Sequence, residues 1–126
     1  MREAVLAMLR ALGVSGADGD PLLDMVIQSV QQRIKNLTNL QKIPEGLRSV
    51  VVSMAAGEYL SMKKGSGQLE NFDLEMAVSQ IQEGDTNISF AVGDGSSTPE
   101  QRLDSLINFL INGQMNEIYR YRRIAW

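Results

Sequence analysis

Residues 20–37 read DPLLDMVIQSVQQRIKNL, and this stretch determines the fold class. Asp20 can cap a helix whose first position is Pro21, because a proline there loses no intrahelical hydrogen bond. Apolar side chains then recur every three or four residues, at Leu23, Ile27, Val30, Ile34 and Leu37. This spacing places them on one face of an α-helix. We therefore predict a helix from Pro21 to Leu37 that buries one face in a core.

The same period predicts three further helices. They cover residues 2–12, the stretch from Pro44 to the Lys63-Lys64 pair, and the stretch from Thr98 to Gly113. Gly13 follows the first of them and suits a left-handed C-terminal cap. The sequence thus predicts a mainly α protein. We expect a four-helix domain at residues 1–113, with a polar insertion at 65–97, and a C-terminal docking arm at 114–126.

The helix that begins at Pro44 contains the run Ala55-Ala56-Gly57. Its glycine lowers helix propensity by about 1 kcal/mol, so a packing reason is expected. Two interpretations remain open. Either a neighbouring helix of the same core crosses closely at this run, or a second subunit does.

The polar insertion contains a predicted β-hairpin. Gly84 and Asp85 are typical of a turn, and Ile88, Phe90 and Val92 then alternate with polar or small residues. An isolated hairpin is marginally stable in water. We therefore expect this one to lie on the helices or to join a strand of a partner.

The chain of 126 residues contains neither cysteine nor histidine. Its length, with 44% apolar and 21% charged residues, is typical of one globular domain. The missing residue types exclude disulfides, thiolate nucleophiles, the Ser-His-Asp relay and most zinc sites. No apolar run is long enough to span a bilayer. We expect no enzyme activity, no cofactor or metal, no small-molecule substrate and no membrane contact.

Carboxylate chemistry is the enzyme alternative that remains. Glu70, Asp73 and Glu75 are close in sequence and would form half of an acid–base site if a cleft held them. No apolar or glycine-rich frame surrounds them, which favours a solvated face. Asp85 and Asp94 lack the alternating ligand spacing of a calcium loop and are better interpreted as turn residues.

The last twelve residues, Met115–Trp126, carry the clearest functional signal. Their charge is +2, whereas residues 1–114 carry −5, and they contain three of the seven aromatic residues. Arginine, tyrosine and tryptophan dominate binding hot spots because each combines a large contact area with a polar group. We therefore predict that this arm contacts another macromolecule through Tyr119, Arg120, Tyr121, Arg122, Arg123 and Trp126.

Other interpretations of the arm stay open. It can fold back as a final helical turn or strand, with its arginines meeting the excess acids of the body. It can also contact nucleic acid backbone. Three arginines on a chain of net charge −3 would bind DNA weakly and with strong salt dependence, so docking into another protein is the favoured interpretation.

Several short motifs follow one another in a specific order. They are Asp20-Pro21-Leu22-Leu23, Gln32-Arg33-Ile34-Lys35-Asn36-Leu37, Ile43-Pro44-Glu45-Gly46-Leu47, Gly84-Asp85-Thr86-Asn87-Ile88-Ser89-Phe90 and Tyr121-Arg122-Arg123-Ile124-Ala125-Trp126. Over nearly the full chain, this order resembles the head-tail connector, or adaptor, family of tailed bacteriophages and prophages. The insertion between Lys64 and Thr98 is longer than in the simplest family pattern, so the resemblance assigns it no firm role.

The resemblance implies a structural virion protein, made in the host bacterial cytoplasm and located at the head–tail junction. Family members form a ring, usually a dodecamer, beneath the portal vertex, where the ring extends the DNA channel and receives a neck or tail protein. DNA would pass through without specific binding. By position, the arm residues Tyr119, Arg120, Tyr121, Arg122, Arg123 and Trp126 would dock into the portal. Subunit or downstream contacts would fall to Gly84, Asp85, Ile88, Phe90 and Val92.

The alternative function is a small helical DNA-binding or regulatory protein that uses the basic, aromatic arm. It would show salt-sensitive DNA binding and no ring.

Overall fold

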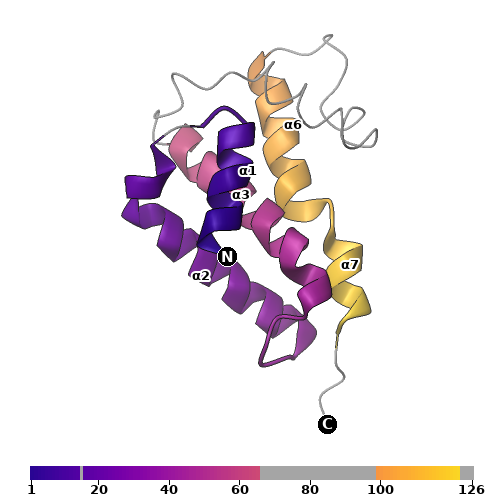
Figure 1. Cartoon of the computed structure of the whole chain (residues 1–126). Coiled ribbons are helices and arrows are strands. Elements are labelled where there is room, and N and C mark those ends of the chain that lie inside the picture. The colour runs from indigo at the N-terminus through magenta and orange to yellow at the C-terminus, as the bar shows by residue number, and fades with distance from the viewer. Residues whose placement is uncertain (15, 66–98, 123–126) are drawn as a thin grey trace.

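The computed structural model describes residues 1–14, 16–65 and 99–122 (Figure 1). Most of the polar insertion lies outside the described residues, and so does the hairpin predicted there. The same holds for the end of the arm. The predicted contact residues outside the described part are therefore Gly84, Asp85, Ile88, Phe90, Val92, Arg123 and Trp126.

The described part of the chain is helical and contains no strand, which confirms the predicted mainly α fold. Its α-helices are α1 (Arg2–Ala11), α2 (Pro21–Thr38), α3 (Arg48–Gly65), α6 (Pro99–Asn112) and α7 (Met115–Arg120). Two short 3₁₀ helices, η1 (Ala17–Gly19) and η2 (Glu45–Leu47), lie in the connections. The four long helices match the four predicted from the apolar period, and α7 is a short fifth helix inside the predicted arm.

The predicted caps of α1 and α2 are confirmed. Gly13 has a φ of 88°, and the N–H groups of Gly13 and Val14 donate to the carbonyls of Arg10 and Leu9, which is the Schellman pattern. At the start of α2, Asp20 Oδ1 accepts a hydrogen bond from the Leu22 N–H at 3.0 Å. These local interactions fix where α1 ends and where α2 begins.

The predicted start of the third helix at Pro44 is wrong by one turn. Pro44 is extended, with φ −60° and ψ 146°, and the chain makes the 3₁₀ helix η2 before α3 begins at Arg48. The tighter turn places Leu47 in the core, fully buried. The fixed φ of proline is compatible with the residue before a 3₁₀ helix and with the first turn of an α-helix. The sequence alone therefore does not distinguish these two positions for Pro44.

Helix α3 is the centre of the fold. It packs against α1, α2 and α6, and Figure 1 shows it passing behind α1 between the other two. A helix with neighbours on several sides needs apolar residues around its circumference. This explains why its buried residues are Val50, Val51, Met54, Ala55, Ala56, Gly57, Tyr59 and Leu60.

The Ala55-Ala56-Gly57 run is the crossing point of α3 and α6. A Cβ atom at Gly57 would lie 2.8 Å from the Leu110 Cβ and 2.9 Å from the Ile111 Cγ1. Both distances are shorter than real Cβ contacts allow. Of the two interpretations, close crossing within the same core is therefore confirmed.

We expect Gly57→Val to lower the free energy of unfolding by about 2–3 kcal/mol, because the added carbons overlap Leu110 and Ile111. Gly65→Val is the matched control, since a Cβ added at Gly65 would meet no atom within 4 Å. Urea denaturation of both variants and the parent measures the difference. Equal stability of the two variants would contradict the close crossing.

Candidate interaction surface

The arm begins as a helix packed on the body. Helix α6 ends at Asn112, and Gly113 still donates its N–H to the Phe109 carbonyl at 2.8 Å. A Cβ at Gly113 would lie 2.6 Å from that carbonyl oxygen, so glycine is required where the chain turns into α7. Helix α7 then lies against α2, and its Ile118 side chain is fully buried. The first half of the arm is thus anchored by the buried Ile118, and Met115 packs beside it, partly buried, against the core.

Tyr121 forms a second contact between arm and body. A Cβ added at Gly46 would overlap the Tyr121 hydroxyl oxygen and approach the ring carbon that bears it to 2.8 Å. The ring tip therefore lies directly over the backbone of η2. Gly46 has no side chain in the way, which lets the phenol lie there while 39% of Tyr121 remains exposed.

The opposite side of α7 faces solvent. Tyr119 is 50% exposed, and Arg120 and Arg122 are exposed as well. Arg120 is 3.4 Å from the Glu117 carboxylate, a pair on the surface that contributes little because water screens it. We call Tyr119, Arg120, Tyr121 and Arg122 the arm face. These four predicted docking residues follow one another in the chain and are all exposed, although the ring of Tyr121 lies against η2.

A polar cluster joins the start of α2 to the end of α3. Asp20 Oδ2 accepts a hydrogen bond from the Tyr59 hydroxyl at 2.9 Å and lies 2.5 Å from Lys63 Nζ. Lys63 Nζ is also 5.6 Å from the centre of the Tyr59 ring, within cation–π range. Tyr59 itself is 3% exposed. One carboxylate therefore caps α2 and links it to two residues of α3.

The pKa shifts in this cluster indicate a structural role. The hydrogen bond from Lys63, followed by that from the Leu22 N–H, lowers the pKa of Asp20. Burial, together with the hydrogen bond to Asp20, raises the pKa of Tyr59 to about 12. An acid–base pair that works at neutral pH needs pKa values moved toward neutrality. Both shifts go the other way, so at neutral pH Asp20 is ionised and Tyr59 is neutral, and their hydrogen bond stabilises the fold.

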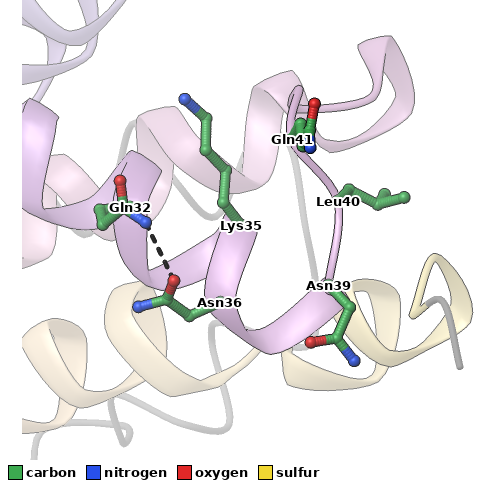
Figure 2. A pocket seen from close by; sticks show the side chains of 6 residues that line it. All are labelled: Gln32, Lys35, Asn36, Asn39, Leu40 and Gln41. Carbon is green, nitrogen blue, oxygen red and sulfur yellow. Dashed lines mark hydrogen bonds between the residues drawn. The ribbon is translucent and has the colours of Figure 1, made fainter. Parts of the chain in front are cut away.

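A shallow polar depression lies at the end of α2. Figure 2 shows its six lining residues, Gln32, Lys35, Asn36, Asn39, Leu40 and Gln41. Gln32 Nε2 donates to Asn36 Oδ1 at 2.9 Å, and Asn39 has the left-handed backbone that ends the helix. Amides and one lysine can hydrogen-bond to a partner.

Within the described residues, no group of three or more carboxylates could hold a metal ion. None of the helices described there has the length and apolar character needed to cross a membrane. The acidic residues considered above for acid–base or calcium chemistry lie outside the described part. They are Glu70, Asp73, Glu75, Asp85 and Asp94.

Comparison of the chain with protein-family models, curated protein sequences and solved structures finds no match in any of the three. Sequence reasoning identified the arm face but missed its anchors, Ile118 and the contact between Tyr121 and Gly46. The signal for Ile118 was present, because Ile111, Met115 and Ile118 continue the spacing of four and three residues beyond Gly113.

We expect Ile118→Ala to release α7 from α2. A buried isoleucine replaced by alanine costs about 2–5 kcal/mol, but here the loss should appear mainly as local opening of a short terminal helix. Hydrogen exchange should therefore rise in residues 115–122 while α3 keeps its protection. Met115→Ala is the control. Because Met115 is only half-buried in the same helix, this variant should raise hydrogen exchange less than Ile118→Ala does. Unchanged exchange in the Ile118 variant would contradict the anchoring role.

We expect stability to fall between pH 10 and pH 12 because of Tyr59. The pKa of its hydroxyl rises from the 10.0 of an ordinary tyrosine to about 12 in the folded chain, so folding favours the neutral phenol. The stabilisation is complete below pH 10 and is lost, by about 2 kcal/mol, as the pH rises to 12. Chemical denaturation across this range measures the loss. The Tyr59→Phe variant should lose this part of the decrease in the free energy of unfolding between pH 10 and pH 12. An unchanged decrease would contradict its assignment to Tyr59.

Proposed function

We propose that the chain is a structural subunit of a ring at the portal vertex of a tailed bacteriophage or prophage. The ring joins the DNA-filled head to the tail and extends the DNA channel. Its partners are the portal protein, a downstream neck or tail protein and further copies of the chain, usually in a dodecamer. The protein acts by binding, without catalysis.

The observation that carries this proposal is that the arm is fixed to the body by a buried residue while its neighbours are exposed. Ile118 is buried against the body, while Tyr119, Arg120 and Arg122 beside it are exposed to solvent. Aromatic and arginine side chains are frequent hot spots of protein interfaces. The arm face is therefore suited to dock into a groove of another protein.

In a ring, the contact of each single arm with the target can be weak. If each subunit presents the same arm face to a symmetric target, binding of one copy raises the effective concentration of the others. A small exposed surface on one chain then becomes a strong attachment for the assembly. This supports a function in which many copies engage one partner at once.

The arm experiment uses Tyr119→Ala, Arg120→Ala and Arg122→Ala together. These side chains are exposed, so the body should keep its unfolding midpoint. We expect the triple variant to lose sedimentation with portal-bearing capsids of the phage or prophage that encodes the chain. Ile118 stays in place, because its removal would change folding as well as docking.

The matched control is Met25→Ala with Arg10→Ala, an exposed apolar residue and an exposed arginine on other helices. The control should sediment with capsids as the parent does. Attachment of the triple variant at the parental level would contradict the role of the arm face. Salt-sensitive binding of duplex DNA that depends on the arm arginines, with no ring seen by native mass spectrometry, would favour the DNA-binding alternative.

A further inference from the structure

Helix α7 covers a surface formed by an earlier part of the chain. It lies against α2, where Ile118 is fully buried, and the tip of the Tyr121 ring lies over Gly46 of η2. We call the surface of α2 and Gly46 that α7 covers the arm site. Every copy of the chain has one arm site and one α7 whose shape and chemistry fit it.

The turn between α6 and α7 brings α7 to the arm site of its own chain (Figure 1). Gly113 still donates its N–H to the Phe109 carbonyl. The next helical bond, from the Gln114 N–H to the Leu110 carbonyl, is not formed within the described residues. A continuous α-helix would form it. Straightening the turn therefore adds backbone hydrogen bonding, and it moves α7 away from its own arm site.

The turn also leaves a buried polar atom without a partner. The side-chain oxygen of Gln114 is buried and accepts no hydrogen bond from the part of the chain that the structure describes. A buried acceptor without a donor is destabilising, because it has lost its hydrogen bonds to water. The turn that folds α7 back therefore has a free-energy cost that the contacts of Ile118 must offset.

We propose that α7 of one copy occupies the arm site of a second copy. The buried contacts are then the same as within one chain, so the exchange adds no side-chain contact and loses none. It releases the turn at Gly113 and Gln114, and a high concentration of chains offsets the freedom lost when two molecules join. Because α7 buries the same side, Tyr119, Arg120 and Arg122 stay exposed.

The exchange can close in two ways. Two copies can each donate α7 to the other, or each copy can donate α7 to the next one around a ring. The inference therefore goes beyond the proposed function and does not require it. In the proposed ring, it identifies a contact that joins neighbouring subunits.

The absence of cysteine from the chain allows a direct test by cross-linking. One chain carries Gly46→Cys and a second carries Tyr121→Cys, which places a thiol on each side of the contact. A bifunctional thiol reagent about as long as a tyrosine side chain bridges the two. Refolded together at high concentration, the two chains should give a covalent heterodimer whose yield rises with concentration. A chain with both substitutions should be bridged within itself when dilute.

The matched mixture adds Ile118→Asp to the chain that carries Tyr121→Cys. A carboxylate is costly to bury in place of a fully buried isoleucine. The yield of covalent heterodimer should therefore fall at least about tenfold. An equal yield from the two mixtures would show that the thiols meet without α7 in the arm site, which would contradict the exchange.

The turn gives a second test in a chain without cysteine. Gly113→Ala adds a Cβ that meets the Phe109 carbonyl oxygen, so it disfavours the turn, whereas alanine favours a continuous helix. Native mass spectrometry should show association about tenfold tighter than that of the parent. Gly65→Ala, at an open position, should associate as the parent does. Gly113→Ala combined with Ile118→Asp should stay monomeric.

Two results would overturn the exchange. One is bridging within the doubly substituted chain, with no heterodimer in the mixture at any concentration. The other is a monomeric Gly113→Ala chain in which residues 115–122 keep their protection from hydrogen exchange, because α7 would then remain on its own chain.

The outcome for the exchange is distinguishable from that for the proposed function. Exchange only between two copies would support the inference and count against the proposed ring. Capsid sedimentation measures docking independently, so attachment without exchange would contradict this inference alone.

Discussion

The close contact between α3 and α6 at Gly57 is the constraint on which the rest of the structure depends. Helix α6 returns to the body only after residues 66–98, and it packs where α3 has its smallest side chains. Its contact residues Leu110 and Ile111 lie just before Gly113, where the chain turns into α7. A larger residue at Gly57 would therefore displace the helix from which the arm starts, as well as opening the core.

The arm depends on this placement because α7 is too short to be a stable helix by itself. Six residues form few backbone hydrogen bonds, so the helix persists only through packing. Ile118 and the contact of Tyr121 with Gly46 supply that packing and also set the direction in which Tyr119 and Arg120 point. The start of the arm thus folds back on the body as a helical turn, as one interpretation of the sequence allowed, but through Ile118 and Tyr121, whereas Arg120 pairs with Glu117 of the arm itself.

The sequence predicted the long helices because their signals are local. Asp20 with Pro21 marks one helix start, Gly13 marks one helix end, and the apolar period identifies the buried faces. It did not predict the turn at Pro44, since the same residue fits an α-helical or a 3₁₀ entry. The contacts of Gly57 with α6 and of Gly46 with Tyr121 join residues far apart in the chain. A glycine indicates that space is needed, but only the fold shows which side chain occupies it.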